Sequence, residues 1–317
     1  MRVLFWGTPD FATPALRALI GEGFDVVGVV TQPDRPVGRS RSTVATSPVK
    51  AIAIDEGIPV LQPERPRGDE VLSQLSQLKP DLSVVVAYGH ILPTAVIDLP
   101  RRGTVNIHGS LLPALRGAAP IQAAIREGRT ETGVTIMRMV PALDAGPIIL
   151  QARTAVLDDE TYGELSLRLS ELGALTLIEA LSLMELGGDR EETQEERHAT
   201  YAPKIDRAST WIDWSAPAST VCRLIRSLDP KPGGLTMLRG TEVKMFGAKL
   251  APRIASMAPG QIAAIDGEGM VVACGDGGAR VTVVQPAGKR RLSPNDWARG
   301  RGVAAGDRFE AAPAAVS

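Results

Sequence analysis

The sequence predicts an α/β protein with a doubly wound, mostly parallel sheet, followed by a small β-barrel of the oligonucleotide-binding type. Two observations support this prediction. Apolar runs rich in Val and Ile alternate with helical patterns up to about residue 187, as expected where helices cover both faces of a sheet. Beyond that point, short strand patterns are separated by glycine turns, which is typical of a small barrel or, alternatively, of a plain sandwich.

The strands expected in the first part are short segments rich in strand-forming side chains. They are Val3–Trp6, Val26–Val30, Val60–Leu61, Leu82–Ala87, Val105–Ile107, Val134–Met139 and Ile148–Val156. Helices are expected between several of them, where apolar residues recur with a period of about 3.6 residues. These helical patterns cover Phe11–Ile20, Val71–Leu78, Pro120–Glu127 and Thr161–Leu186.

The second part is expected to contain a helix at Ala218–Ser227 and then several short strands. The strands are Gly233–Leu238, Glu242–Phe246, Gly260–Ile265, Met270–Ala273 and Arg280–Val284. Glycine-containing turns separate them, as in the stretch 275–278. This arrangement suggests a small, partly open barrel.

A polar, acidic stretch that opens with two glycines divides the two parts at residues 187–196. We therefore expect a catalytic domain over residues 1–187, a linker over 188–206 and a second domain over 207–317. The net charge of −1 hides an uneven distribution, because residues 197–317 hold 17 basic and 10 acidic side chains, a net of +7. Such a surface is either ordinarily solvated or follows a phosphate backbone.

Several classes of protein are disfavoured by the sequence. Cys222 and Cys274 are too few for a disulfide framework or a cysteine zinc site. There is no apolar run of membrane-spanning length and no secretory leader pattern, so we expect a cytoplasmic protein without a membrane partner. The first turn, Gly7–Ala12, is not a Gly-x-Gly-x-x-Gly sequence, which disfavours a dinucleotide site.

The most informative polar residues are Asn106 and His108, which lie two apart in a predicted strand and therefore point to the same side. An amide and an imidazole can both donate hydrogen bonds to an oxygen that gains negative charge. If Asp144 in the turn Leu143–Pro147 lies beside His108, it can support the protonated imidazole and relay a proton. The alternative is that Asn106 is a capping residue, His108 a surface residue and Asp144 only a turn former.

These residues stand in segments that resemble the folate-dependent formyltransferases. The signature is carried by Asn106–Pro113, Arg116–Gln122, Thr132–Ile136 and Leu143–Gly146. Similar segments extend over nearly the whole chain: Gly7–Ala12, Thr31–Arg39, Ser47–Lys50, Val86–Gly89, Tyr201–Ile205, Ile212–Trp214 and Gln285–Lys289. The segments after residue 200 favour the members with a second domain, because the smaller members that formylate glycinamide ribonucleotide lack it.

The resemblance implies transfer of a formyl group from 10-formyltetrahydrofolate, as a co-substrate, to the α-amine of methionine on initiator tRNA. It also implies that no metal is needed. Asn106 and protonated His108 would stabilise the oxyanion of the tetrahedral intermediate. Asp144 would support the imidazolium and help move the amine proton to N10 of the folate.

The resemblance further implies binding residues. The folate would lie against Ser110, Leu111, Leu112 and Pro113, with Tyr88 and Gly89 close to the pterin. The loop 33–46 would contact the tRNA acceptor stem through Arg35, Arg39 and Arg41, although Ser40, Ser42 and Thr43 replace basic residues of the family pattern. The second domain would contribute Arg207, Lys244, Lys249, Lys289, Arg290 and Arg291.

Two other functions stay open at the level of the sequence. One is formylation of a different amine, such as that of a nucleotide sugar, at the same folate site; this substrate would not need a basic second domain. The other is RNA binding without catalysis on an inactive α/β scaffold, which the presence of Asn106, His108 and Asp144 disfavours. We also expect the protein to be a monomer.

Overall fold

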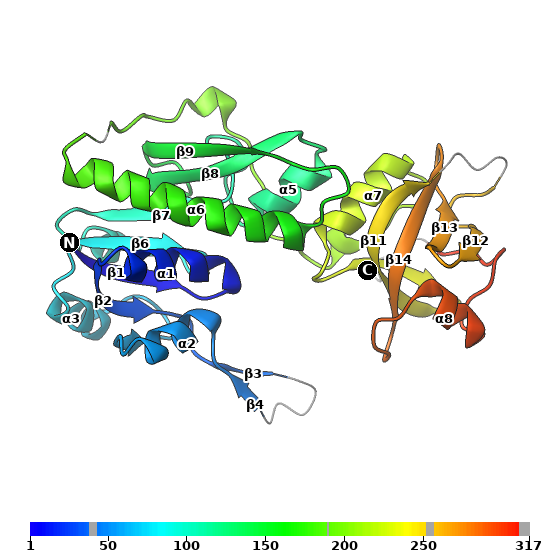
Figure 1. Cartoon of the computed structure of the whole chain (residues 1–317), viewed down its shortest axis with the longest axis horizontal. Helices are drawn as coiled ribbons and strands as arrows, with labels where there is room; N and C mark the ends of the chain where they lie inside the picture. Colours follow the sequence, from blue (N-terminus) through cyan, green and yellow to red (C-terminus); the bar gives the residue numbers. More distant parts are fainter. Residues whose placement is uncertain (38–42, 189, 252–256, 311–317) are drawn as a thin grey trace. The chain divides into compact units, whose positions relative to one another are not determined.

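The computed structural model divides the chain into two compact units (Figure 1). It describes residues 1–37, 43–188, 190–251 and 257–310. Unit 1 consists of Met1–Pro120, Glu131–Ala155 and Ser166–Ala202, whereas unit 2 consists of Ile121–Thr130, Val156–Leu165 and Pro203–Ser317. Each unit has its own hydrophobic core.

Unit 1 is built on a seven-stranded sheet in the order β5-β2-β1-β6-β7-β8-β9. The strands are β1 (Arg2–Gly7), β2 (Asp25–Val30), β5 (Val60–Leu61), β6 (Leu82–Val86), β7 (Thr104–His108), β8 (Glu131–Arg138) and β9 (Ile148–Ala155). Neighbours from β5 to β7 pair in parallel, and β8 and β9 add an antiparallel edge. The predicted mostly parallel sheet is confirmed.

Helices cover both faces of this sheet, because alternate side chains along β1 pack into cores on opposite sides. The helices that begin in the first 190 residues are α1 (Thr13–Gly21), α2 (Pro48–Asp55), α3 (Asp69–Gln77), α4 (Thr94–Ile97), α5 (Pro120–Arg126) and α6 (Tyr162–Glu185). Val3 and Phe5 pack into one core with residues of α1, α2 and α6. Leu4 and Trp6 pack on the opposite face with residues of α3 and α4. The sheet is therefore doubly wound, as predicted.

Two helices of unit 1 were not predicted from the sequence. α2 starts at Pro48, and the hydroxyl of its N-cap residue Ser47 accepts a hydrogen bond from Lys50 N at 3.1 Å. A Ser-Pro start of this kind is a recognised helix signal. α4 covers only Thr94–Ile97, which is too short to show a helical period.

Unit 2 contains a five-stranded antiparallel sheet in the order β10-β11-β14-β13-β12. Its strands are β10 (Gly234–Leu238), β11 (Thr241–Ala251), β12 (Ile262–Asp266), β13 (Gly269–Ala273) and β14 (Gly278–Pro286). The segment 306–310 reaches both sheet edges: Glu310 N donates to Met237 O, and Ile262 N donates to Asp307 O. One sheet whose edges meet a common segment fits the predicted barrel and not a two-sheet sandwich.

The core of unit 2 is formed between this sheet and α7 (Ala218–Ser227), the predicted helix, together with α8 (Pro294–Arg299). Trp214 is buried there, stacks on Phe309 with ring centroids 5.7 Å apart, and donates from Nε1 to Thr236 Oγ1 at 2.9 Å. Burial raises the pKa of the Cys222 thiol to about 11 and that of Cys274 to about 12. Both thiols are therefore unreactive packing groups.

A small hairpin forms the base of the predicted tRNA loop. β3 (Arg35–Val37) pairs antiparallel with β4 (Thr43–Ala45). Just before it, Lys50 Nζ donates to Asp34 Oδ2, and Gln62 Nε2 donates to Asp34 Oδ1 at 3.0 Å. Arg39 and Arg41, two of the predicted contacts, lie outside the described residues.

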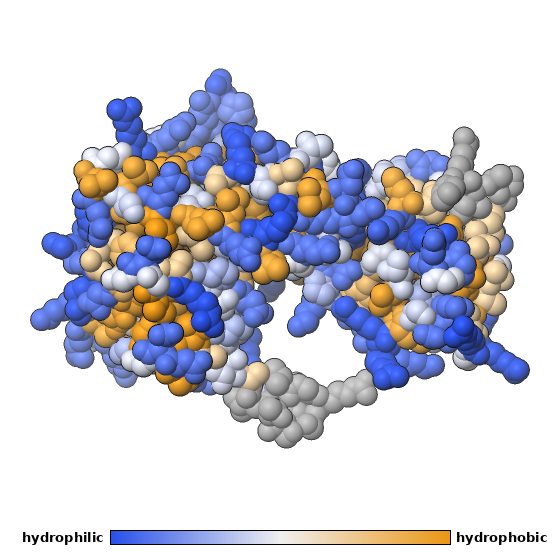
Figure 2. Space-filling model, in the orientation of Figure 1, coloured by the Kyte–Doolittle hydropathy of each residue, from blue (hydrophilic) through white to orange (hydrophobic). Residues whose placement is uncertain are grey.

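On the face drawn in Figure 2, apolar side chains are interspersed with hydrophilic ones. None of the helices among the described residues combines the length and the apolar character that crossing a bilayer requires.

Candidate active site

The candidate site lies on one face of β7. Val105 and Ile107 point into the core that contains α6, so Asn106 and His108 project from the opposite face. There, β7 is approached by two loops, residues 109–119 and 139–147, which both contact His108. The strand periodicity used in the sequence analysis thus places the two side chains on one face, as predicted.

His108 is held between these loops and is 6% exposed. Its Nε2 lies 2.9 Å from the carbonyl oxygen of Leu115. Because a carbonyl only accepts hydrogen bonds, Nε2 carries the hydrogen. Nδ1 lies 3.7 Å from Asp144 Oδ2, which is beyond hydrogen-bond distance. Nδ1 is therefore the ring atom that faces the reactive region.

Asp144 reaches His108 because the chain folds back after β8. β8 is antiparallel to β7, and Met139 N bonds to Thr104 O at the beginning of β7. The loop then returns, with Asp144 at φ 48°, a left-handed conformation that Asp adopts more readily than most residues. Asp144 Oδ2 accepts a hydrogen bond of 2.7 Å from Gly117 N. The carboxylate is thus held between the two loops.

Asn106 is half-buried between its sheet neighbours Val85 and Met137. Its carboxamide forms no hydrogen bond to any of the described residues. An amide donor without a protein partner, two residues from His108, suits an oxygen that gains negative charge. In the described part of the chain, no three His, Cys, Asp or Glu side chains gather as a metal ion would require.

The segment that begins at Ser110, predicted to bind folate, is fastened to β8 and β9. Thr135 Oγ1 donates to Ser110 O at 2.7 Å and accepts from Leu112 N at 3.1 Å. Gln151 Nε2 donates to Leu112 O and to Thr135 Oγ1, both at 2.9 Å. Thr135 is fully buried, so these bonds are shielded from water and hold the loop in one conformation.

The four predicted folate residues of this loop differ in exposure. Ser110 is buried and its hydroxyl donates to Ala114 O at 2.6 Å. Leu112 is buried against Met137 and Ile148. Leu111 and Pro113 are half-buried, so they are the side chains of the segment with surface available to a ligand.

Tyr88 and Gly89 follow β6 directly. The Tyr88 ring is buried edge-on against Trp6 at 5.1 Å between centroids, and burial raises the pKa of its hydroxyl to about 12. Its carbonyl accepts from Gln32 Nε2 at 3.0 Å. Gly89 is exposed. Any contact of this pair with a pterin would therefore involve the backbone and Gly89, since the Tyr88 ring faces the core.

Several residues that support the site carry no recognisable signal in the sequence. Thr135 and Gln151 fasten the loop, and Gln194, placed in the predicted linker, donates from Nε2 to Asp144 O at 2.8 Å and to Gly146 O at 2.7 Å. Ser, Thr and Gln side chains occur too widely for such roles to be visible in one sequence.

Two exposed apolar side chains in loops that follow strands of unit 1 were also not predicted. Ile91 is 84% exposed in the segment after β6, and Leu143, just before Asp144, is 57% exposed. Large apolar side chains left in solvent beside polar site residues are common in ligand pockets. The sequence contained a usable signal for both residues: Ile91 follows a predicted strand, and Leu143 precedes the candidate carboxylate.

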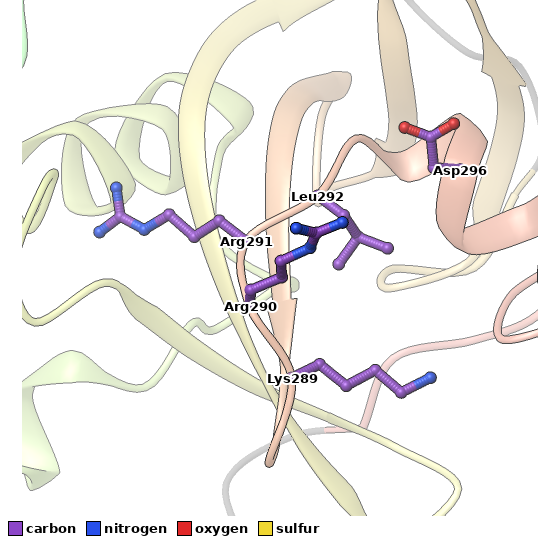
Figure 3. A pocket seen from close by; sticks show the side chains of 5 residues that line it. All are labelled: Lys289, Arg290, Arg291, Leu292 and Asp296. Carbon is purple, nitrogen blue, oxygen red and sulfur yellow. The ribbon is translucent and has the colours of Figure 1, made fainter.

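In unit 2, three of the predicted tRNA contacts stand in the loop between β14 and α8. Lys289, Arg290 and Arg291 line a hollow of about 600 Å³ together with Leu292 and Asp296 (Figure 3). Arg291 points away from the other two cations in Figure 3; it lies 3.7 Å from the Phe246 ring centroid and donates to Pro230 O. Within the described residues, neither Lys289 nor Arg290 has an ion-pair partner.

The remaining predicted cations are placed differently. Arg207 pairs with Glu242 and lies 5.7 Å from the Trp211 ring centroid. Lys244 is half-buried and Lys249 exposed, both on β11. In unit 1, Arg35 Nη2 donates to Gln32 Oε1 at 3.1 Å. Exposed cations without a carboxylate partner are the better candidates for phosphate contacts.

Comparisons with protein families agree with this architecture. Residues 1–181 match the family described as formyl transferase. Residues 204–302 match the formyl transferase C-terminal domain. Two family domains in this order account for most of the chain.

Two relatives are similar over nearly their whole length. A methionyl-tRNA formyltransferase of Methylococcus capsulatus is 47% identical over 304 residues, covering 96% of this chain and 98% of the relative. One of Bacillus licheniformis is 44% identical over 306 residues, covering 96% of both chains.

Two solved structures share the fold. HypX from Aquifex aeolicus, in complex with tetrahydrofolic acid, has a TM-score of 0.65 at 20% identity and covers 93% of this chain and 46% of its own. An N-formyltransferase from Helicobacter canadensis, in complex with folinic acid and dTDP-3-aminofucose, has a TM-score of 0.67 at 16% identity and covers 92% and 99%. At these identities the likeness concerns the fold alone.

Proposed function

The chain belongs to the methionyl-tRNA formyltransferase family and transfers a formyl group from 10-formyltetrahydrofolate to methionyl initiator tRNA, and we propose that Asn106, His108 and Asp144 perform the transfer. The observation that carries this assignment is the 3.7 Å approach of His108 Nδ1 to Asp144 Oδ2. It occurs on the face of β7 where the Asn106 carboxamide forms no hydrogen bond to the residues that the structure describes.

The reaction needs charge stabilisation at one oxygen and movement of one proton. The free amine of methionine attacks the formyl carbon, a carbon–nitrogen bond forms, and the formyl oxygen becomes an oxyanion. Asn106 donates a hydrogen bond to this oxygen. The intermediate then collapses: the bond between the formyl carbon and N10 breaks, and the proton lost by the amine goes to N10. Asp144 is the base nearest to this path.

The contact with Leu115 defines how His108 takes part. Because Nε2–H is bonded to Leu115 O, only Nδ1 is left to donate to the oxyanion. It does so only when both ring nitrogens carry hydrogen, which is the imidazolium form. Asp144 Oδ2 lies 3.7 Å from Nδ1, so its carboxylate stands beside the ring atom that would donate. The His108 imidazolium therefore supplies a positive charge beside the oxyanion.

We propose residues 1–187 as the catalytic domain, 188–206 as the linker and 207–317 as the tRNA-binding domain, in line with the two family matches. Folate would lie against the loop that begins at Ser110, mainly on Leu111 and Pro113, and beside Gly89. Leu111 and Pro113 are half-buried and Gly89 is exposed, so each has surface available to a ligand, which supports this placement.

The tRNA would contact Lys289 and Arg290, which have no carboxylate partner in the described part of the chain, together with Lys244 and Lys249 on β11. Arg35, Arg39, Arg41, Arg207 and Arg291 complete the proposed set. Arg207 and Arg291 already have protein partners, which makes their contribution to phosphate binding smaller. We also propose a cytoplasmic monomer, since aminoacylated tRNA is made in that compartment.

The test is a formylation assay with purified protein, 10-formyltetrahydrofolate and methionyl initiator tRNA, followed by detection of formylmethionine. Elongator methionyl-tRNA is the specificity control and should react much more slowly. The amine of a nucleotide sugar is the competing substrate. Formylation of that amine, with none of the tRNA, would contradict the proposed substrate.

A further inference from the structure

We propose that the segment Gln194–Ala202, which the sequence predicts as linker, is a positioning element of the active site, and that Gln194 holds the turn that carries Asp144. The proposal rests on the proposed function, because it takes His108 and Asp144 as catalytic residues. The segment lies within unit 1, as do all the contacts that support the proposal.

Gln194 holds the Asp144 turn from both sides. Its Nε2 donates to Asp144 O at 2.8 Å and to Gly146 O at 2.7 Å, which uses both hydrogens of the amide. The residue is 7% exposed. Asp144 has a φ of 48°, and a non-glycine residue keeps such a conformation only when its surroundings impose it. The two bonds from Gln194 fix that turn and so direct Oδ2 toward His108.

Arg116 in turn holds Gln194. Its side chain is 2% exposed, and its Nε and Nη2 donate to Gln194 Oε1 at 3.1 and 2.9 Å. Its Nη1 donates to both carboxylate oxygens of Glu196, at 2.7 and 3.0 Å. Because a guanidinium only donates, the Gln194 oxygen must face Arg116 and the nitrogen must face the Asp144 turn. A buried cation left without these partners is strongly unfavourable, so the segment stays docked.

The same segment supports His108. The carbonyl of Leu115 accepts from His108 Nε2, and Leu115 N donates to Thr200 Oγ1 at 2.9 Å. The next residues approach the segment closely: a Cβ at Gly117, which has φ 113°, would lie 2.6 Å from Ala202 O. Both partners of the catalytic pair are therefore positioned through residues 194–202.

The first test is Gln194→Glu. Glutamate has the same shape and keeps an oxygen for Arg116, but it turns a second oxygen toward the carbonyls of Asp144 and Gly146. We expect kcat to fall by about 10- to 100-fold, as small displacements of catalytic groups produce. KM for both substrates should change by less than about threefold. Gln194→Met, similar in length and without hydrogen-bonding groups, is the second variant. It should likewise lower kcat while KM changes little.

The deciding measurement is a double-mutant cycle with Asp144→Asn, in single-turnover assays with excess enzyme. A residue that acts through Asp144 loses its effect when Asp144 is changed, so Gln194→Glu should lower the rate by less than about twofold in that background. A merely structural role would lower the rate by the same factor in both backgrounds. Gln74→Glu is the matched control: it is the same chemical change at an exposed position of α3, and the variant should keep the wild-type rate.

Wild-type rates for both Gln194 variants would overturn the proposal, as would equal factors in the two backgrounds. A near wild-type rate for Asp144→Asn would refute the assignment of the catalytic residues and the proposal with it. The rate of Asp144→Asn therefore distinguishes a failure of the catalytic assignment from a failure of the positioning proposal alone.

Discussion

Asn106 and His108 sit two residues apart, but the protein constrains them differently. His108 is fixed by Leu115 and faces Asp144, whereas the Asn106 carboxamide has no hydrogen-bond partner among the described residues. Removing the Asn106 amide therefore removes a group that the fold itself does not use. A substitution of Asn106 should therefore affect catalysis without affecting stability, which makes this residue the most informative one for testing the proposed mechanism.

We predict that Asn106→Ala lowers kcat by about 10²–10³, the usual effect of losing one oxyanion donor. The thermal midpoint should change little, because the Asn106 carboxamide makes no hydrogen bond to residues in the described ranges. Steady-state formylation of initiator tRNA and a thermal melt check both expectations. Asn295→Ala, the same chemical change in α8, is the matched control; a folded Asn106→Ala protein with near wild-type kcat would contradict the assignment.

At the level of single residues, the sequence revealed the groups that do chemistry and not those that hold them. Asn106 and His108 were recognisable because a strand places alternate residues on one face. The contact of His108 with Asp144 depends on a loop that folds back after an antiparallel strand, which no local pattern encodes. Gln194 was hidden in a polar stretch typical of linkers, since its partners are 48 and 50 residues away.

Among the elements, the strands were the most predictable part of the fold. β1, β2, β6 and β7 are largely buried and rich in β-branched or aromatic residues, so their sequence pattern is unambiguous. α2, α4 and α8 were missed because each is only four to eight residues long and shows too few turns for a periodic signal. Their starts were nevertheless visible in part: Ser47-Pro48 and Ser293-Pro294 are both N-cap sequences.

The hairpin β3–β4 is fastened at its base by a charged network. Hydrogen bonds from Lys50 and, to a smaller extent, from Gln62 lower the pKa of Asp34 below its ordinary value of 3.8. A folded-state pKa below the unfolded one means that the carboxylate stabilises the fold above about pH 3.8. This contribution is lost as the pH falls from that value through the lowered pKa.

We predict that Asp34→Asn lowers the free energy of unfolding by about 1 kcal/mol near neutral pH. The difference from the wild type should shrink below about pH 3.8. Urea unfolding measured as a function of pH checks this expectation. A difference that persists unchanged at pH 3 would show that the carboxylate charge is not the cause.

For the whole molecule, the distribution of charge is more informative than its sum. The net charge is −1, while residues 197–317 carry 17 basic and 10 acidic side chains. A local excess of positive charge attracts a polyanion even when the total is near zero. The tRNA affinity of a chain with this distribution should therefore depend strongly on ionic strength.

We predict that the double variant Lys289→Ala, Arg290→Ala binds methionyl initiator tRNA more weakly at low salt. The slope of log affinity against log salt concentration should become shallower by about 2, one for each phosphate that the variant no longer neutralises. Arg239→Ala is the control, because Asp307 already pairs with that cation at 2.5 Å. Filter binding over a salt series measures both slopes, and an unchanged slope in the double variant would argue against a role of these two cations in phosphate binding.

The segment 306–310, which bonds to β10 and to the beginning of β12, also affects how the protein behaves in a crowded solution. Unpaired sheet edges are templates for strands of other chains. Glu310 N and Phe309 N instead supply partners within the same molecule. Proteolytic loss of these residues would expose two edges at once and convert a self-contained barrel into a seed for intermolecular strand pairing. Keeping this short stretch docked is therefore a matter of solubility as well as of fold.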